Sequence, residues 1–179
     1  MKYLLIRILF VSSLFGLLSC TSMKVSGELL NSQNEHNYST FEVVTPVNLS
    51  DKVSTTNKTL IEESIISEVV NQLNLSYDNS AELTINYFVI VNPQKDIDAY
   101  VNYYGNRRWG YTTVTENVRE YTEGSLIIDV IDKRKETIIW HGVATDILKE
   151  KQSDLSIQIQ EASQKLISSY KEDITNKNS

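Results

Sequence analysis

Two stretches of the chain repeat apolar residues at intervals of three and four positions, the spacing of a helix with one buried face. The first begins at Thr59, where a Thr-x-x-Glu capping box can satisfy free backbone amides at a helix start. The second follows Ser153 or Asp154, either of which can cap a helix. We therefore expect two amphipathic helices, with apolar faces made of Ile61, Ile65, Ile66, Val69, Val70 and Leu73 and of Leu155, Ile159, Ala162, Leu166 and Tyr170.

Strand patterns fill much of the remaining chain. Residues 38–47 favour a first strand, and residues 81–92 alternate between two faces. Residues 125–145 predict a β-hairpin around the charged turn at 132–136. Consecutive strands joined by short turns run antiparallel, and both helices need an apolar sheet face to cover. The pattern therefore predicts an α+β fold, a two-layer sandwich of a mostly antiparallel sheet with two helices packed on one face.

The first nineteen residues have a different pattern from the rest. They carry Lys2 and Arg7, then an apolar run of about half the ~20 residues that a membrane-spanning helix needs. They end in Leu-Leu-Ser before Cys20, which resembles the lipobox of a bacterial lipoprotein signal. We expect residues 1–19 to be a cleaved signal peptide and acyl chains on Cys20 to anchor the chain to membrane lipid. An ordinary secretory signal is the alternative.

The composition after the signal favours one domain on a tether. Polar residues 20–37 suit a lipidated flexible tether, residues 38–172 a single α+β domain, and residues 173–179 a polar tail. Of the 17 Lys and Arg, two lie in the signal, so the remaining chain has 15 against 23 Asp and Glu. Because this acidic balance repels phosphate, we expect no nucleic-acid partner.

The residues that usually hold metals are scarce. Cys20 is the only cysteine, which excludes an intramolecular disulfide, and the only histidines are His36 and His141. Asp96 and Asp98 lack the glycine and the distal acid of a calcium loop. A Gly-x-Ser-x-Gly nucleophile motif does not occur. We therefore expect no metal and no cofactor.

A loop is expected over residues 93–111, where Pro93, Gly105 and Gly110 interrupt the strand pattern. Aromatic rings and guanidinium groups are favoured at recognition surfaces. This loop is therefore our candidate binding site for an envelope protein or a glycan, and packing of its aromatic residues on their own sheet edge is the structural alternative. The candidate binding-loop residues are Tyr100, Tyr103, Tyr104, Arg107, Arg108, Trp109 and Tyr111.

Three residues of the predicted hairpin have a structural and a functional interpretation. Asp129 lies mid-strand among aliphatic residues and could be a general acid, but no second group stands at a helpful spacing, so a hydrogen-bonded strand residue is favoured. Asp132 is favoured as a turn former. Trp140 alternates in phase with Ile138 and Ala144, which favours a core position.

The hairpin also carries a family resemblance. Residues 121–132 contain Gly-Ser-Leu-Ile-Ile-Asp and residues 138–144 read Ile-Ile-Trp-His-Gly-Val-Ala. This pair of strands resembles the envelope lipoproteins of the domain-of-unknown-function 4136 family, over roughly residues 38–170. His141 stands where that family often has arginine, and Tyr170-Lys171 replaces a Phe-Pro ending. The resemblance implies an envelope location and this fold, and it implies no activity.

These observations together predict a lipid-anchored protein of the cell envelope. Thr21 follows the cysteine in place of aspartate, which favours the outer membrane over the inner one. The expected function is a non-enzymatic binding or assembly module. A hydrolase that uses Asp129 or His141, and a structural or stress-related envelope protein without a dedicated ligand, are the alternatives.

Overall fold

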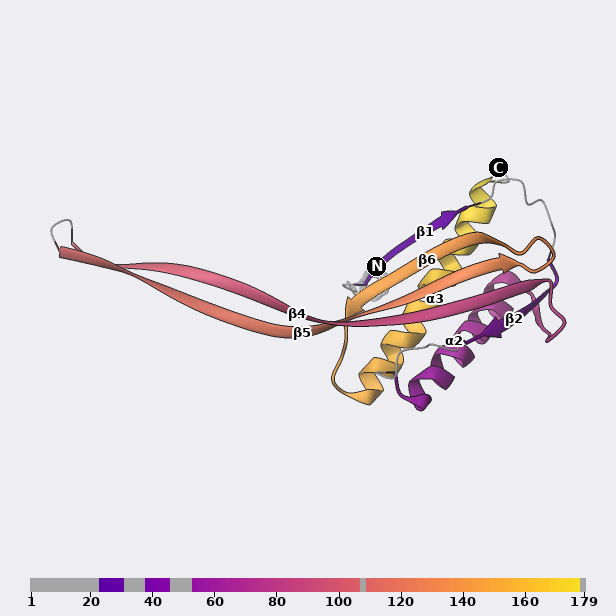
Figure 1. Cartoon of the computed structure of the whole chain (residues 1–179), viewed down its shortest axis with the longest axis horizontal. Coiled ribbons are helices and arrows are strands. Elements are labelled where there is room, and N and C mark those ends of the chain that lie inside the picture. The colour runs from indigo at the N-terminus through magenta and orange to yellow at the C-terminus, as the bar shows by residue number, and fades with distance from the viewer. Residues whose placement is uncertain (1–22, 31–37, 46–52, 107–108, 178–179) are drawn as a thin grey trace, which may run out of the picture.

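The computed structural model describes residues 23–30, 38–45, 53–106 and 109–177, and for residues 97–117 it describes the backbone alone. The chain has two helices and six strands in these ranges (Figure 1). In chain order they are β1 (Lys24–Leu29), β2 (Thr40–Val44), α2 (Thr55–Leu73), β3 (Ser76–Tyr77), β4 (Leu83–Asn106), β5 (Trp109–Asp132), β6 (Thr137–Ile147) and α3 (Gln152–Lys177).

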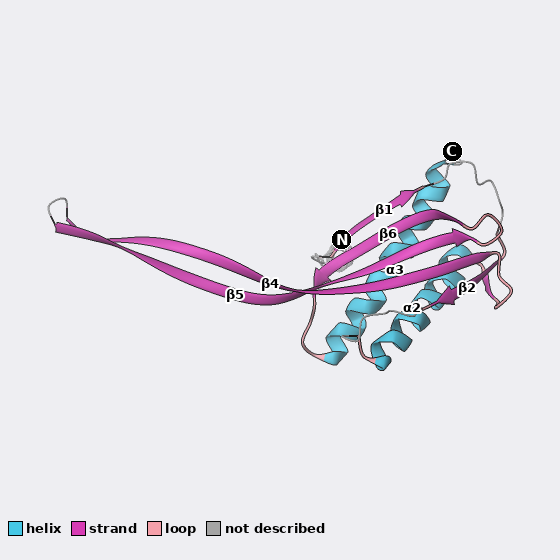
Figure 2. Cartoon of the chain, in the orientation of Figure 1, coloured by secondary structure: helices cyan, strands magenta, loops and turns pink. Residues whose placement is uncertain are grey.

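The strands form one sheet in the order β1-β6-β5-β4-β2-β3, and both helices pack on one face of it (Figure 2). Pairing is antiparallel from β1 through β4, whereas β2 is parallel to both β4 and β3. The parallel step arises because α2 connects β2 to the strands that follow. The two-layer α+β fold expected from the sequence is confirmed.

The core lies between the inner face of the sheet and the two helices. The alternation expected in residues 81–92 is confirmed at Leu83, Ile85 and Tyr87, which are all buried. The helices contribute the residues expected of their apolar faces, except that Val70 is exposed and Leu155 is not part of the core cluster. The most deeply buried large apolar side chains are Phe41, Ile65, Val69, Leu83, Ile85, Tyr87, Ile128, Val130, Trp140, Leu166 and Ile167.

Trp140 occupies the core as expected. The prediction that Ile138 shares its face of the strand is wrong. The β5–β6 register shifts between Val130 and Ile131, so that Val130 pairs with Trp140 and Ile131 pairs with Ile138. The extra residue in β6 is Ile139, which is buried beside Trp140, whereas Ile138 is exposed. A bulge of this kind changes the side-chain phase within one strand, and strict alternation does not reveal it.

The first helix begins earlier than the expected capping box. Ser54 is the N-cap, and its Oγ accepts a hydrogen bond from the backbone N–H of Asn57 at 3.2 Å. Thr59 and Glu62 therefore lie inside α2, where the Glu62 carboxylate accepts a hydrogen bond from the hydroxyl of Tyr87. The helix ends at Asn74, whose left-handed backbone (φ 57°) suits this residue type.

Two segments expected to lie outside the domain are part of it. Residues 24–29, assigned to the flexible tether, form the edge strand β1, which pairs with β6. The polar tail expected from residue 173 continues α3 to Lys177, and the Asp173 carboxylate accepts a 2.8 Å hydrogen bond from the Trp140 ring. Both segments also pack a few partly buried apolar residues against the core, namely Val25, Leu29 and Ile174. Pairing with a distant strand leaves little local pattern by which such residues could be recognised.

Candidate functional site: the arm and the outer sheet face

The loop expected over residues 93–111 is instead a long two-stranded β-ribbon. β4 and β5 pair without interruption from Leu83–Asp132 to Asn106–Trp109. The pairing of β5 with β6 ends at Glu123–Ile147, and that of β4 with β2 ends at Asn86. We call the part beyond the Asn92–Glu123 pair the arm, and the rest of the described chain the body. The arm projects from the body as the long ribbon of Figure 1.

The arm is long relative to the body, and its outer edges have no partner strand among the described residues. From Asn92 to Asn106 it advances fourteen residues, about 46 Å at the usual rise of a strand. Glycine and proline do not end the strands, because Pro93 pairs with Thr122 at an edge and Gly105 pairs with Gly110 near the turn. These residues therefore act as strand residues and were misleading as loop signals.

The structure brings the expected binding residues together at the distal end of the arm. Tyr104 pairs with Tyr111, and Asn106 pairs with Trp109. Arg107 and Arg108 lie outside the described residues. The remaining candidates are in the same ribbon, namely Tyr100 and Tyr103 in β4.

Charge divides the arm into two parts. Near the body, Lys95 and Glu120 form an exposed ion pair at 2.6 Å, and Asp96 pairs in register with Arg119. From residue 99 to residue 115 the sequence contains no Asp or Glu, although the whole chain has 23. The distal arm is therefore an acid-free, tyrosine-rich end of an acidic protein.

On the outer face of the sheet, opposite the helices, the structure pairs Asp129 with His141. The Asp129 Oδ1 and His141 Nδ1 atoms are 2.6 Å apart, and the two side chains are 15% and 43% exposed. The expectation that Asp129 has no partner is therefore wrong, while its interpretation as a hydrogen-bonded strand residue is confirmed. The partner was missed because His141 lies on the next strand and comes opposite Asp129 only through the register.

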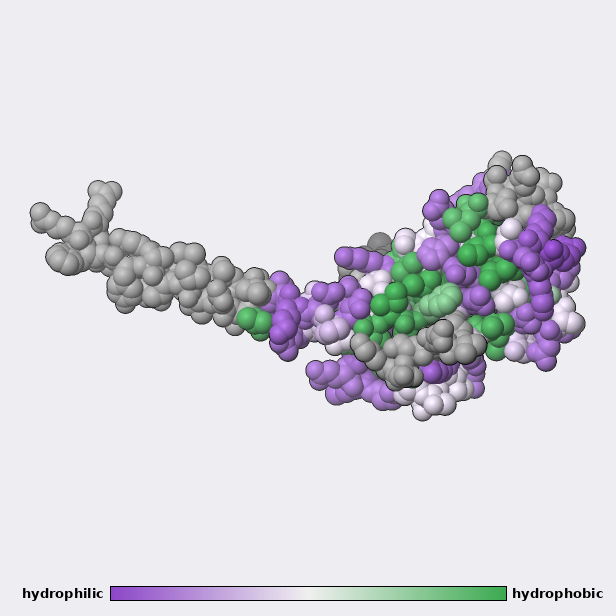
Figure 3. Space-filling model, in the orientation of Figure 1, coloured by the Kyte–Doolittle hydropathy of each residue, from purple (hydrophilic) through white to green (hydrophobic). Residues whose placement is uncertain are grey.

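Polar residues flank this dyad in the register, with Glu28 opposite His141 and Asn86 opposite Asp129, and exposed apolar residues lie elsewhere on the same strands. Phe88 and Ile90 are exposed on β4, and Ile138 is exposed on β6. Figure 3 shows hydrophobic residues gathered over the body, with hydrophilic residues between and around them. The outer face is thus a mixed surface, with one imidazole–carboxylate pair in it and no hydroxyl or thiol hydrogen-bonded to His141 among the described residues.

Asp132 has the turn-forming role expected of it. Its Oδ1 accepts hydrogen bonds from the backbone amides of Arg134 and Lys135, and its Oδ2 accepts one from the Tyr38 hydroxyl at 2.9 Å. Burial opposes ionisation, but these hydrogen bonds outweigh it, and the pKa of Asp132 lies below its ordinary value. Burial, together with the neighbouring carboxylate, raises the pKa of Tyr38 well above the ordinary range.

A second polar cluster, which the sequence did not indicate, connects α2 to the sheet. The Glu62 carboxylate accepts hydrogen bonds from the hydroxyls of Thr45 and Tyr87, and these two hydroxyls lie 3.3 Å apart. Burial raises the pKa of Tyr87 to about 12. Because the phenol stays neutral and donates, the cluster is a structural tie between helix and sheet.

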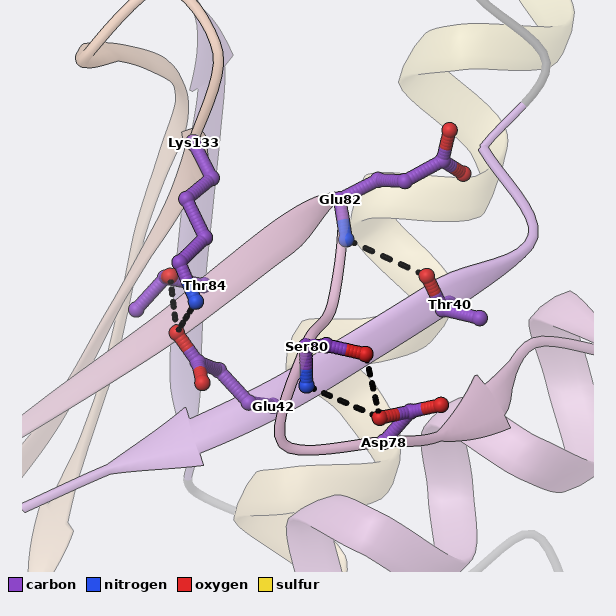
Figure 4. A network of polar contacts seen from close by, with 7 residues as sticks. All are labelled: Thr40, Glu42, Asp78, Ser80, Glu82, Thr84 and Lys133. Carbon is purple, nitrogen blue, oxygen red and sulfur yellow. Dashed lines mark hydrogen bonds and ion pairs between the residues drawn. The ribbon is translucent and has the colours of Figure 1, made fainter.

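The parallel pairing of β2 with β4 has its own polar network at the end of the body (Figure 4). Glu42 accepts hydrogen bonds from Lys133 Nζ and Thr84 Oγ1, both at 2.8 Å, and the Lys133 contact is the main cause of its lowered pKa. Asp78 accepts from the backbone amide and the hydroxyl of Ser80. The carboxylates here serve turns and strand pairing.

A small apolar cavity of about 170 Å³ opens between the sheet and the starts of both helices. Its walls include Met23, Val89, Leu126, Leu148 and Ile159. The polar side chains at its edge hydrogen-bond within the protein, because the Gln158 amide donates to Asp146 and to the carbonyl of Ile147. Nothing in this cavity resembles a catalytic centre.

Within the described ranges, no three His, Cys, Asp or Glu side chains are grouped so as to hold a metal ion. Asp96 and Asp98 lie along β4, opposite Arg119 and Asn117 in the register. In the same part of the chain, no helix combines the length and the apolar character needed to cross a membrane. His36 and Cys20 fall outside the described residues.

A family model, described as a domain of unknown function, matches residues 30–170. The chain belongs to the DUF4136 family. The match includes the hairpin that carried the resemblance, the whole arm and most of α3. The search against curated proteins gave no significant match.

One solved structure is similar in fold at low sequence identity, and two others are more distantly similar. A PDZ domain protein from Parabacteroides distasonis is 16% identical with a TM-score of 0.52, and the match covers 83% of this chain and 36% of that one. The DUF4136 chain therefore spans about a third of that protein. PelC from Paraburkholderia phytofirmans, solved as a dodecamer, is 10% identical (TM-score 0.43; 82% and 95% covered). A neuraminyllactose-binding hemagglutinin homologue from Helicobacter pylori is 15% identical (TM-score 0.42; 84% and 89% covered).

Proposed function

We propose that this DUF4136 chain is a lipid-anchored protein of the cell envelope and a non-enzymatic binding or assembly module whose contact element is the arm. The observation that carries the proposal is the ribbon beyond Asn92 and Glu123, which leaves the body with only its own two strands paired. The described strands of this ribbon include Tyr100, Tyr103, Tyr104, Trp109 and Tyr111, five of the residues that the sequence marks for recognition.

The physical support comes from the cost of such a ribbon. A two-stranded hairpin alone is marginally stable in water, and each of its outer edges presents unpaired backbone groups. Among the arm side chains that the structure describes, at residues 93–96 and 118–122, none belongs to the buried core. A ribbon this long is therefore best explained by a contact that it makes outside its own chain.

The anchor is supported by the signal-like first nineteen residues and by the position of Cys20. More than one acyl chain on a thiol is needed for durable attachment, which is the chemistry that a lipobox directs. Thr21 after the cysteine favours the outer membrane as the location. Lipid through Cys20 and an envelope component at the arm are the two proposed partners.

Intact-mass measurement of the protein purified from membranes tests the anchor. We expect the mature chain to begin at Cys20 and to carry the mass of its acyl groups, and we expect Cys20→Ser to abolish membrane recovery. An unmodified thiol, or a chain that still begins at Met1, would refute the anchor.

Site-specific photocrosslinking tests the arm. A photoreactive amino acid replacing Val114, in the arm, should give a defined adduct with an envelope component in intact cells. The same amino acid at Val70, an exposed apolar position on α2, is the matched control and should give none. Equal labelling at both positions would remove the arm as the contact element.

One observation favours a second candidate, a hydrolase. Asp129 orients the exposed imidazole of His141, the arrangement that activates a general base. If this pair performs chemistry, Asp129→Asn should abolish the cellular phenotype of the gene while the protein stays folded. If the protein is a binding module, the same variant should complement fully.

A further inference from the structure

The start of β1 determines where an anchor would be attached to the molecule. Lys24 pairs with Thr145, Thr145 with Ser125, and Ser125 with Ile90, so all four lie in one row across the sheet. Ile90 is two residues before the base of the arm. In Figure 1, the beginning of β1 accordingly lies beside the point where β4 and β5 leave the body. The chain enters the fold at the waist between body and arm.

The tether to this waist is short. Cys20 precedes Lys24 by four residues, which span at most about 14 Å when fully extended. The arm extends about 46 Å on one side of the waist, and the ten-residue body part of β5, from Glu123 to Asp132, extends about 30 Å on the other. Both lengths exceed the tether.

An upright orientation is therefore impossible for a chain anchored at Cys20. With the long axis of the molecule along the membrane normal, one half must point toward the bilayer. If the body points to the water, the arm enters the bilayer, and if the arm points to the water, the body enters it. Neither can cross the hydrocarbon region. No other described strand pairs with the edges of the ribbon, and lipid cannot satisfy the amides and carbonyls there. The body carries charged turns such as Lys133 to Glu136.

The sequence of the distal arm suits the remaining orientation. Tyr100, Tyr103, Tyr104, Trp109 and Tyr111 belong to a stretch without acidic residues. Tyrosine and tryptophan are enriched at the level of lipid headgroups, where water still satisfies backbone groups. The acids of the arm lie nearer the body, at Asp96, Asp98, Glu116 and Glu120.

We infer that the arm lies along the surface of the membrane that holds Cys20, with its tyrosine- and tryptophan-rich distal part at the lipid headgroups. This inference rests on the proposed lipid anchor and names the partner of the arm. The long axis of the molecule runs close to the membrane plane. The anchor at the waist and the distal arm then hold the body at two points.

Tryptophan fluorescence tests this orientation with residues that the chain already has. The two tryptophans are Trp109 in the arm and Trp140, which is fully buried in the body. The full lipidated protein is reconstituted in vesicles of phosphatidylethanolamine and phosphatidylglycerol, with and without bromine on the acyl chains near the headgroup. Bromine should quench Trp109 emission roughly twofold, as expected for an interfacial tryptophan. Trp109→Phe is the control and should remove the quenched component.

The outcomes separate the arm from the anchor. Flotation with vesicles and the intact mass report the anchor alone. Protein that is acylated and floats, yet shows unquenched Trp109 emission, overturns the inference and leaves the anchor intact. Protein that is not acylated refutes the proposed anchor itself. A protein adduct instead of a lipid adduct from a photoreactive residue at Val114 would assign the arm to a protein partner and also overturn the inference.

Discussion

The two halves of β4 and β5 form one continuous antiparallel ladder in two different environments. In the body, Ile85 and Val130 pair beneath two helices and are fully buried, and further strands flank the pair on both sides. In the arm, Val101 and Val114 pair in the same ladder with no further strand beside them among the described residues. Identical backbone pairing thus lies over a buried core in one half and stands without a neighbouring strand in the described part of the other half.

The comparison shows where the free energy of folding lies. Each large apolar side chain buried in the body contributes about 1.5–3 kcal/mol. The arm adds backbone hydrogen bonds whose net contribution is about 0.5–1.5 kcal/mol each, against a similar cost of ordering the chain. Stability therefore belongs to the body, and changes in the two halves should have very different effects.

The two tryptophans give the largest expected contrast. Trp140 is fully buried, donates its ring N–H to Asp173 and packs against Tyr170 with ring centroids 5.3 Å apart. Trp140→Ala should lower the free energy of unfolding by about 3–5 kcal/mol in urea titrations. Trp109→Ala should change it by less than about 0.5 kcal/mol. Equal losses would show that the arm shares the core's stability.

Gly142→Ala comes next in expected size. A Cβ at this position would come within 2.6 Å of Trp140 Cζ3, and the ring cannot retreat because it is packed and hydrogen-bonded. We expect a loss of about 1–3 kcal/mol, measured as a lower urea midpoint. The matched control is the neighbouring His141→Ala on the outer face, with a loss of about 1 kcal/mol or less. An unchanged midpoint for Gly142→Ala would contradict the packing described for β6.

Tyr38→Phe should have a pH-dependent effect. The Tyr38 hydroxyl helps to keep the pKa of the buried Asp132 below its ordinary value, so ionised Asp132 stabilises the fold above about pH 4. That contribution is lost as the pH falls through the lowered pKa. Tyr38→Phe should therefore cost about 1–2 kcal/mol at pH 7, and the difference from the wild type should shrink in acid unfolding titrations. If the two proteins differed by the same free energy of unfolding at every pH, Tyr38 would not act through the charge of Asp132.

Replacing residues 93–122 with Asn-Gly should have the smallest effect on stability. The two residues form a tight turn between Asn92 and Glu123, which already pair in the register. We expect the free energy of unfolding to change by less than about 1 kcal/mol, because none of the removed side chains that the structure describes is buried. The shortened chain should lose the Val114-region contact. A collapse in stability would show that the arm supports the body.

Much of the body was predictable from local pattern. The period of α2 and α3, the alternation at Leu83, Ile85 and Tyr87, and the hairpin around the 132–136 turn were all confirmed. These signals are local because burial repeats with the period of the element itself. The sequence also marked the aromatic residues of the arm, although it assigned them to a loop.

The remaining features were decided by pairing between distant segments. The Asp129–His141 contact, the edge strand β1, the parallel β2–β4 step and the length of the arm depend on which strands meet and in which register. Such pairing is a property of the whole sheet and leaves no periodic trace in any one strand. The amino-acid sequence by itself therefore determined the elements and most of the core. Only the tertiary structure decided that the chain enters at a waist, with a body on one side and an arm on the other.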